Sequence, residues 1–280
     1  MDTITSRRNP AVKAIRELKK RAARDTLGLA FIEGFRLVRD ALSSGAVIRT
    51  LYMSDSFARG GGRGYIEAQA AEKKVKLISL ADGVYESVTD TKNPQGLLAV
   101  VETFDYSLSD LLIRRDGPRR LLMLDRVADP GNAGAMLRTA EAAAFSGVVL
   151  SEGCVDIYEP KTLRAAMGSA FRIPFLRGAG LPETAEILKR EGFRIYAAAP
   201  SAVSGGGDKR NNCFNGRPGG GGDGDIALII GGEAAGVSAE LLDMCDGVLS
   251  IPMRGSVESL NAGVAAGILM YEFVRRELAD

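Results

Sequence analysis

Three short segments of the chain carry the residue types whose spacing could support chemistry. They read D-P-G-N-A-G-A-M-L-R (129–138), G-G-E-A-A-G (231–236) and I-P-M-R-G-S-V-E-S-L-N (251–261). Each follows or includes the end of an apolar run of the kind that forms a buried strand. In open α/β sheets ligands bind outside the carboxyl ends of the strands. The three segments together therefore predict one ligand site.

The first segment predicts a helix with a cationic face. Asp129 followed by Pro130 is typical of a helix start. Gly131, Gly134 and Arg138 are spaced i, i+3 and i+7 and so share one face. Two missing side chains beside a guanidinium would let a bulky anionic partner approach closely. The alternative is that the glycines allow tight helix packing and that Arg138 is a surface ion-pair residue.

The second segment has neither the G-x-G-x-x-G spacing of a dinucleotide fold nor the lysine and hydroxyl of a P-loop. Binding of a nucleoside triphosphate is therefore not expected. Its glycines would let backbone groups surround a neutral or cationic ligand, with Glu233 as the fixed charge. The alternative is a plain turn from strand to helix with an exposed glutamate.

The third segment combines a rigid apolar edge with polar groups at a helix start. Residues 251–253 (Ile-Pro-Met) suit a flat base, and Ser259 and Asn261 offer a hydroxyl and an amide. The alternative is that a serine caps the helix and that Ala262, Gly263, Ala266 and Gly267 form a small-residue packing face.

Composition excludes several classes of enzyme. The chain has no histidine, which removes the most common general base and transition-metal ligand together with every Ser-His-Asp and Cys-His triad. Three scattered cysteines without C-x-x-C argue for a reducing compartment and against a disulfide framework or zinc site. With no signal-type N-terminus and no membrane-spanning apolar run, we expect a cytoplasmic protein that uses no metal and contacts no membrane.

The elements that must position the three segments form an α/β protein. Residues 119–280 alternate strand-like runs with helical segments, which predicts parallel βαβ units with helices on both faces. The strand-like runs are 121–125, 147–151, 193–198, 226–230 and 248–252, and a last helix is expected over about 260–278. A glycine-rich stretch (204–225) is interpreted as a flexible surface insertion. An alternative role for this stretch is RNA contact through Lys209, Arg210 and Arg217.

The front of the chain predicts a smaller α/β domain over 1–103, joined by a polar link over 104–118. Its strand-like runs are 29–33, 47–53, 75–79 and 97–101. Asn9 and Pro10 predict a helix start, and Val12, Ile15 and Leu18 supply an apolar edge. Eight basic residues against two acidic ones over 1–24 form either a footprint for phosphate backbones or an ordinary solvated helix face.

Taken together, the segments resemble the three motifs of the SpoU/TrmH family of RNA ribose 2′-O-methyltransferases, within the SPOUT superfamily. The order is D-P-x-N-x-G-x-x-x-R-T, then G-x-E-x-x-G, then I-P-M with S-L-N and V-A-A-G. The intervening Y-E-P-K-T-L-R-A-A-M-G-S-A-F-R-I-P (158–174) is similar as well. So are S-R-R-N-P-A-V-K (6–13), F-I-E-G-F-R-L-V (31–38) and T-D-T-K-N-P-Q-G-L-L-A-V (89–100), which resemble the family's ribosomal-protein-like RNA-binding domain.

The resemblance implies a deep trefoil knot in the C-terminal domain, with S-adenosylmethionine bound in the knotted loops, and a homodimer formed through that domain. The cofactor-binding residues that it implies are Ile230, Gly231, Gly232, Ile251, Met253 and Leu260. The implied reaction centre is Asn132, Arg138, Glu233, Ser259 and Asn261. The implied RNA-binding residues are Arg7, Arg8, Asn9, Lys13 and Arg36.

The resemblance implies methylation of a ribose 2′-hydroxyl in structured RNA, and the accessory domain favours 23S ribosomal RNA. The alternatives are a transfer-RNA 2′-O-methyltransferase and a non-catalytic RNA-binding protein that keeps the fold. Two positions depart from the family pattern, since Gly232 and Gly263 stand where serine is usual. Because the pKa of an arginine lies above about 12, we expect Arg138 to stabilise the developing alkoxide, or to pass a proton only through an RNA phosphate.

Overall fold

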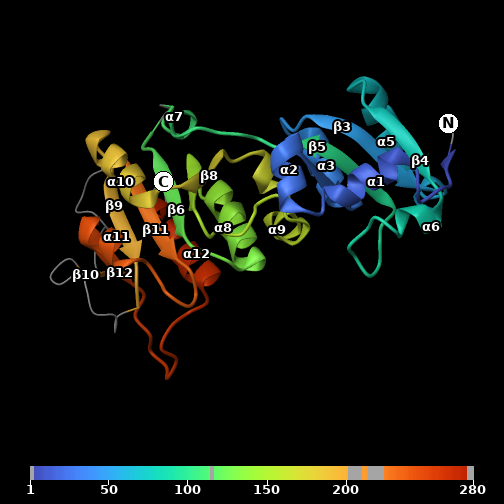
Figure 1. The fold of residues 1–280 in the computed structure, drawn as a ribbon. Helices are drawn as coiled ribbons and strands as arrows, with labels where there is room; N and C mark the ends of the chain where they lie inside the picture. Colours follow the sequence, from blue (N-terminus) through green and yellow to red (C-terminus); the bar gives the residue numbers. More distant parts are fainter. Residues whose placement is uncertain (1–2, 114–116, 201–209, 214–223, 276–280) are drawn as a thin grey trace. The chain divides into compact units, whose positions relative to one another are not determined.

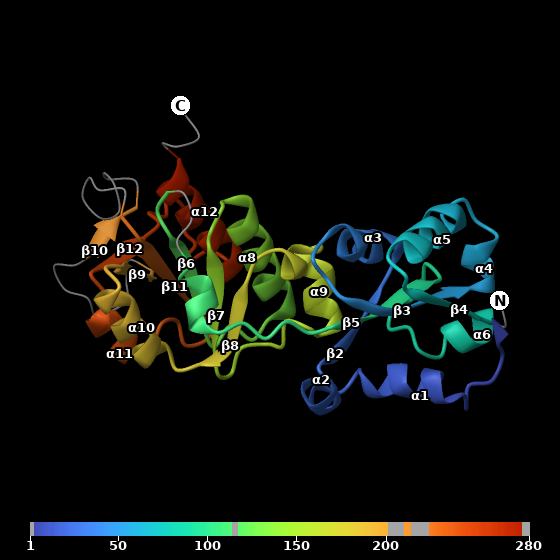
Figure 2. The same ribbon diagram turned by 90° about the horizontal axis from the view of Figure 1, so that it is seen from above.

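The computed structural model describes residues 3–113, 117–200, 210–213 and 224–275, which form two compact units. The first unit contains Met1–Phe104 together with Asp156–Arg172, and the second contains Asp105–Val155 together with Ile173–Asp280. Figures 1 and 2 show each unit as a sheet with helices on both sides. The first unit thus ends one residue after the predicted boundary, but it also takes in a segment that the sequence had placed in the catalytic domain.

The first unit is built on a mixed five-stranded sheet. The strand order is β1 (Thr3–Ile4), β4 (Lys76–Leu80), β3 (Ile48–Ser54), β5 (Leu97–Glu102) and β2 (Leu29–Glu33). Strands β1, β4 and β3 are parallel, whereas β5 runs antiparallel to both β3 and β2. The helices are α1 (Pro10–Glu17), α2 (Arg21–Leu27), α3 (Phe35–Ser43), α4 (Asp55–Ala58), α5 (Arg63–Glu72), α6 (Asp82–Tyr85), α9 (Pro160–Ala166) and the 3₁₀ helix η1 (Ser169–Phe171).

Helix α1 forms as its sequence predicts. The Asn9 side-chain oxygen accepts a hydrogen bond from the Ala11 N–H at 2.9 Å, and Pro10 occupies the first helical position. Val12, Ile15 and Leu18 are buried in a core cluster that includes Phe31, Tyr52 and Leu98 of the sheet. In Figure 2, α1 lies on the opposite side of the sheet from α3 and α5. The apolar edge of α1 therefore fixes it to the sheet and turns its basic residues outward.

A buried ion pair ties the segment after residue 155 to the first unit. The Arg24 guanidinium donates two hydrogen bonds to Asp156 Oδ2, at 3.0 and 2.6 Å, and a third to the Leu18 carbonyl oxygen at 2.8 Å. Both side chains are almost fully buried. Arg24 is therefore not available to RNA, although it belongs to the basic run at the start of the sequence.

The second unit contains a seven-stranded sheet in which every described pairing is parallel, as predicted. The strand order is β10 (Arg210–Asn212), β12 (Gly247–Ser250), β9 (Arg194–Ala198), β11 (Ile226–Gly231), β6 (Arg120–Asp125), β7 (Gly147–Ser151) and β8 (Phe175–Ala179). Helices α10 (Leu181–Arg190) and α11 (Ala239–Met244) cover one face, and α8 (Pro130–Ala142) and α12 (Ala262–Val274) cover the other (Figure 2). Because both faces are covered, strands such as β6 and β11 are apolar along most of their length.

The structure departs from the sequence-based boundaries in three places. The predicted polar link contains α7 (Leu108–Leu111), and Leu111 is buried in the core of the second unit. Strands β1, β8 and β10 were not predicted, and β10 lies inside the predicted insertion, whose residues 204–209 and 214–223 lie outside the described part of the chain. Lys209 and Arg217 lie outside it too. Helix α12 begins two residues later than predicted.

Candidate functional site

A cavity of about 370 Å³ opens in the second unit at the carboxyl ends of β9, β11 and β12. It lies where the sequence placed the ligand site. All the residues expected to hold the cofactor line it, namely Ile230, Gly231, Gly232, Ile251, Met253 and Leu260. Three of the expected reaction-centre residues line it as well: Glu233, Ser259 and Asn261.

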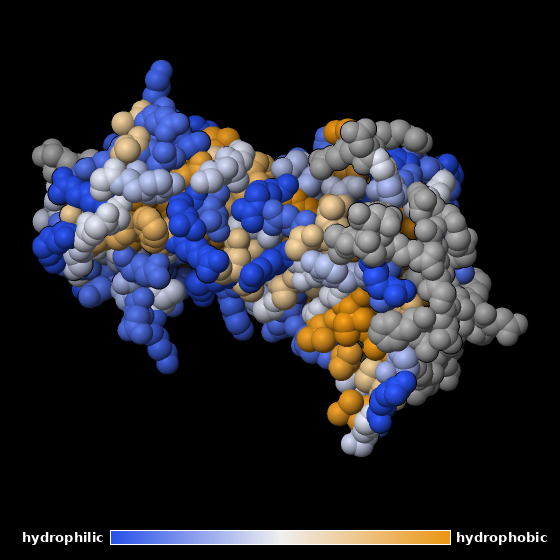
Figure 3. Space-filling view, turned by 180° about the vertical axis from the view of Figure 1, so that it is seen from behind, coloured by the Kyte–Doolittle hydropathy of each residue, from blue (hydrophilic) through white to orange (hydrophobic). Residues whose placement is uncertain are grey.

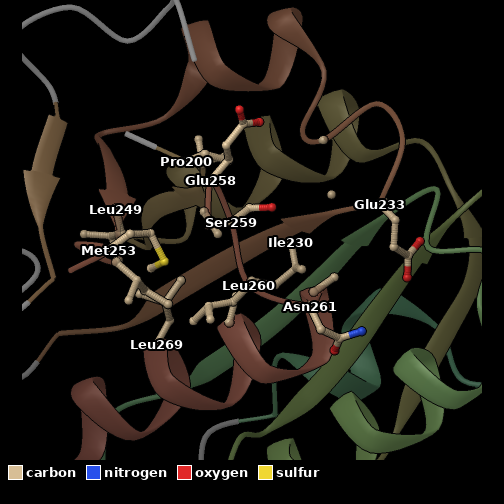
Figure 4. Close-up of a pocket in the computed structure, with 18 residues that line it drawn as sticks. Pro200, Ile230, Glu233, Leu249, Met253, Glu258, Ser259, Leu260, Asn261 and Leu269 are labelled. Carbon is tan, nitrogen blue, oxygen red and sulfur yellow. The ribbon is translucent and has the colours of Figure 1, made fainter. Parts of the chain in front are cut away.

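The cavity has an apolar end and a polar end (Figure 4). Leu249, Met253 and Leu269 gather on one side, while Glu233 and Asn261 lie on the other. Leu249 is the last residue but one of β12, and Leu269 comes from the middle of α12. The site thus offers apolar contact to one part of a ligand and hydrogen-bonding groups to another.

The turn after β11 is built so tightly that only glycine fits. A Cβ atom on Gly231 would lie 2.0 Å from the carbonyl carbon of Gly236, and one on Gly232 would lie 2.4 Å from the Arg126 carbonyl oxygen. The Gly232 N–H donates to the Asp125 carbonyl oxygen at 2.8 Å. The loop after β11 therefore lies directly against the end of β6. This contact accounts for Gly232 at a position where the family usually has serine.

The start of α8 brings the first segment to the polar end of the cavity. The Asp129 side chain accepts a hydrogen bond from the Asn132 N–H at 2.7 Å, which confirms the predicted helix cap. The Asn132 side-chain amide in turn donates to Glu233 Oε1. Glu233 is exposed, as the alternative of a plain turn with an exposed glutamate predicted, but it is also held by a partner from α8.

Asn261, and not Ser259, caps α12. Its side-chain oxygen accepts hydrogen bonds from the Gly263 and Val264 N–H groups at 3.0 and 3.2 Å. A Cβ atom on Gly263 would lie 3.2 Å from the side-chain oxygens of both Asn132 and Asn261. Glycine at this second departure from the family pattern thus lets the starts of α8 and α12 approach each other. The small-residue face expected for α12 does pack against α8.

Arg138 is exposed on α8 and does not line the cavity. It lies nearly two turns after Asn132, which does reach the site through Glu233. Gly134, on the same predicted face, is buried, whereas Gly131 is half-buried. The structure therefore joins Asn132, Glu233 and Asn261 at one end of the cavity and leaves the Arg138 guanidinium at the surface of the same helix.

Sequence reasoning missed two groups that line the cavity. Glu258 adds a second carboxylate to the lining, which already contains Glu233. Residues 198–200, at the end of β9, line the cavity as well. Strand β9 lies between β12 and β11 in the sheet, so its end had to reach the site, but A-A-A-P carries no recognisable motif. Among the described residues that line this cavity, none is lysine or arginine. Its fixed charge is therefore negative.

The residues expected to bind RNA lie in the first unit. Arg7, Arg8 and Lys13 are exposed, and so is Arg36 at the start of α3. The Arg7 Nε donates to the Gly83 carbonyl oxygen at 3.2 Å, which leaves the rest of its guanidinium open. The structure gives the Asn9 side chain a different task, because its oxygen caps α1.

The described part of the chain lacks two further features. None of its helices combines the length and apolar character that a bilayer crossing requires. It brings no three His, Cys, Asp or Glu side chains together in a way that could hold a metal ion.

Comparison with known proteins places both parts of the chain. Residues 119–271 match the SpoU rRNA Methylase family, and residues 9–99 match the MRM3-like substrate binding domain. The chain is 34% identical to the 23S rRNA (guanosine(2553)-2′-O)-methyltransferase RlmP of Bacillus subtilis, over 97% of this chain and 98% of that protein. It is 36% identical to the 23S rRNA (guanosine-2′-O-)-methyltransferase RlmB of Coxiella burnetii, over 73% of this chain and 79% of that protein.

A solved structure supports the same assignment. The AdoMet-bound rRNA methyltransferase from Sinorhizobium meliloti superposes with a TM-score of 0.81 at 29% identity, over 98% of both chains. The family match covers more than half of the present chain and includes all three motif segments. On the strength of the motifs, the cavity that they line and these matches, the chain belongs to the SpoU rRNA Methylase family.

Proposed function

We propose that this protein transfers a methyl group from S-adenosylmethionine to a ribose 2′-hydroxyl of 23S ribosomal RNA. The observation that carries the proposal is the single cavity in which residues from the second and third motif segments meet, with Asn132 of the first segment bonded to Glu233 at its edge. The named activities of the two relatives above support the choice of 23S RNA and make guanosines the first nucleotides to examine.

The cavity fits S-adenosylmethionine in shape and in charge. The apolar side formed by Leu249, Met253 and Leu269 suits the adenine ring, and the carboxylates of Glu233 and Glu258 suit a cationic ligand. The backbone of Ile230, Gly231 and Gly232 would hold the cofactor from one side and that of Ile251, Met253 and Leu260 from the other. When bound, the cofactor supplies an electrophilic methyl group on a sulfonium. The AdoMet-bound S. meliloti structure supports this assignment.

The residues of the chain would align the RNA and assist loss of the hydroxyl proton. Arg138 would stabilise the developing alkoxide, since a guanidinium is a poor base but a good electrostatic partner for an anion. Asn132 and Glu233, already hydrogen-bonded to each other, would form the surface that contacts the ribose. Ser259 and Asn261 would supply further polar groups at the start of α12. Correct alignment by itself removes a large part of the barrier to methyl transfer.

The first unit would bind the phosphates of the RNA backbone through four exposed residues, Arg7, Arg8, Lys13 and Arg36. Replacing Arg7, Arg8 and Lys13 together by alanine should weaken RNA binding and lower its salt dependence. Each lost phosphate contact removes about 0.7 to 0.9 units of the slope of log K against log salt. A slope that stays unchanged in fluorescence anisotropy titrations would show that these residues do not contact phosphates.

Two finer features of the family are also proposed for this chain. The second unit would contain the trefoil knot, which is supported by its match to the SpoU rRNA Methylase family. It would also form a homodimer through α12, which carries exposed Val264 and Tyr271 and half-buried Ile268. Figure 3 shows apolar side chains gathered on this side of the second unit. The three free cysteines support an assignment to the cytoplasm, since that compartment is reducing.

Methyl transfer with labelled cofactor tests the proposed function directly. Purified protein should place the label on 23S ribosomal RNA that lacks modifications, and nuclease digestion should recover it as a 2′-O-methylnucleoside. Label on transfer RNA alone would favour the transfer-RNA alternative. Binding of RNA without any transfer, under conditions in which calorimetry shows that the cofactor binds, would favour the non-catalytic alternative.

A further inference from the structure

The first unit contains a cavity of its own, of about 240 Å³. The end of β2, the start of α3, residues 91–95 and the end of α9 line it. All of these elements belong to the first unit, including α9, which contacts β2 (Figures 1 and 2). No residue expected to bind RNA lines this cavity except Arg36. Apart from Arg36, the proposed RNA contacts therefore do not account for this cavity.

The strongest indication of a ligand is Arg164. Its Nη1 atom is fully buried and has no hydrogen-bond partner within the described chain. Leaving a buried N–H group without an acceptor destabilises the folded state. Native structures therefore contain few such groups. The Arg164 side chain lines the cavity, so a small rotation of its guanidinium would bring Nη1 to an acceptor placed there.

Two side-chain amides add hydrogen-bonding groups to the same wall. Gln95 Oε1 accepts a hydrogen bond from the Phe35 N–H at 2.8 Å, which fixes the amide and leaves its NH₂ group to face another partner. Asn93 is exposed and lines the same cavity. Asparagine and glutamine offer a donor and an acceptor side by side, which is the arrangement that reads the edge of a base.

The two carboxylates of the cavity differ in availability. Glu33 is occupied, because the Thr89 and Thr91 hydroxyls both donate to its Oε1 and the Asp90 N–H donates to its Oε2 at 3.2 Å. Asp40 has a long ion-pair contact of 3.9 Å to Arg39 and is partly exposed. Asp40 lines the cavity as a second carboxylate, and it would repel a phosphate.

Arg36, proposed above to contact a phosphate, also lines this cavity, but the other polar groups of the lining favour a nucleobase as its occupant. A phosphate only accepts hydrogen bonds, whereas the edge of a base both donates and accepts, as the combination of Arg164, Gln95 and Asp40 requires. Leu37 and Met167 provide apolar surface for the faces of the ring. The cavity is smaller than the pockets of roughly 300–1,000 Å³ that hold drug-sized ligands, which limits the occupant to about one base.

We propose that this cavity binds one unstacked nucleobase of the RNA substrate, so that the first unit recognises a single-stranded loop and not only the phosphate backbone. The inference rests on the proposed function, because it takes RNA as the substrate. Sequence-specific proteins commonly read RNA in this way, through bases that are splayed out of loops and bulges.

The test compares binding of two RNAs to the full-length protein. One is a fluorescein-labelled hairpin with a single-stranded loop of randomised sequence, and the other is a fully paired duplex of the same length. Arg164→Met and Asn93→Ala should each weaken hairpin binding by about tenfold while leaving duplex binding and the salt slope unchanged. The matched control is Arg49→Met, which removes an exposed cation of the first unit that does not line the cavity.

Two results would overturn the inference. One is hairpin affinity in Arg164→Met and Asn93→Ala that equals that of Arg49→Met. The other is an equal loss of hairpin and duplex binding with a smaller salt slope, which would indicate a phosphate contact. Circular dichroism checks folding, and if Arg164→Met unfolds, the exposed Asn93 provides the deciding variant.

Methyl transfer by the wild-type protein separates this inference from the proposed function. If the wild type fails to methylate 23S RNA, the proposed function fails and the inference falls with it. If the wild type methylates the RNA and the cavity variants bind the hairpin as the control does, the inference alone is wrong.

Discussion

At the scale of single residues, the site depends on a few side chains that hold one another in place. Asp129 caps α8, which positions Asn132, and Asn132 donates to Glu233. Asn261 caps α12 with its side-chain oxygen. Residue types in the second and third motif segments predicted positions that line the cavity, whereas Arg138 of the first segment does not line it. They did not predict the individual partners, because hydrogen bonds between segments 101 residues apart depend on the packing of the whole unit.

Arg138→Ala should reduce the rate of methyl transfer by about 10² to 10³-fold, because it removes one group that stabilises a developing anion. The affinity for S-adenosylmethionine should stay close to that of the wild type, since Arg138 does not line the cavity. Single-turnover rates and calorimetric titration measure the two effects. Arg190→Ala, a change at an exposed arginine that ends α10, is the control. Full transfer activity in Arg138→Ala would remove this residue from the reaction centre.

At the scale of elements, the ends of adjacent strands shape the cavity through their backbone as well as carrying the motif residues. The turn after β11 leaves no room for a side chain at Gly231, because the chain folds back on Gly236 there. The sequence predicted glycine-rich turns at the right strand ends. It did not predict that the end of β9 lines the cavity, because A-A-A-P (197–200) is also an ordinary loop sequence. The sheet order, which brings β9 between β11 and β12, supplies that information.

Gly231→Ala should lower the affinity for S-adenosylmethionine by roughly tenfold or more, because a Cβ atom at this position overlaps the backbone and displaces the turn. Gly255→Ala lies in the third segment, where an added Cβ atom meets nothing within 4 Å, and should bind as the wild type does. Calorimetric titration of both variants checks this expectation. Equal affinities would mean that the turn after β11 does not shape the cofactor site.

The buried pair between Arg24 and Asp156 decides to which unit the segment after residue 155 belongs. The resemblance of 158–174 to the catalytic domain of the family led us to place it there by sequence. No local pattern marks Asp156 as the partner of an arginine 132 residues earlier in the chain. Only the folded structure brings the two charges together, and their burial explains why the segment packs with the first unit.

Asp156→Ala should destabilise the first unit by about 3–5 kcal/mol, because it leaves the Arg24 charge buried without a carboxylate partner. Asp25→Ala removes an exposed carboxylate from a surface pair with Arg21 and should change stability by less than about 1 kcal/mol. Urea denaturation of the two variants provides the comparison. Similar unfolding midpoints would show that the Arg24–Asp156 pair does not stabilise the first unit.

At the scale of the whole molecule, the chain folds as two units, to which the proposed function assigns different roles. The parallel sheet of the second unit holds the proposed cofactor site, and the first unit carries the exposed cations and the smaller cavity. Alternating strand-like and helical runs predicted this architecture, including the parallel pairing. The proposed assembly of two copies through α12 rests on an apolar surface that a single copy leaves exposed.

Val264→Glu and Tyr271→Glu should each weaken dimerisation by about thirtyfold or more if these side chains lie at the centre of the interface. Light scattering coupled to size-exclusion chromatography should show monomers for both variants at concentrations at which the wild type is dimeric. Ile187→Glu changes an exposed apolar residue on α10 and should leave the dimer intact. Unchanged dimers in the two α12 variants would place the interface elsewhere.

The central claim is that the strand-end cavity serves methyl transfer to one ribose oxygen of 23S ribosomal RNA. The most direct measurement maps 2′-O-methyl marks in RNA from cells with and without the gene. The account predicts that one mark in 23S RNA disappears without the gene, returns with the wild-type gene and does not return with Arg138→Ala. An unchanged set of ribose marks in the cells without the gene would contradict it.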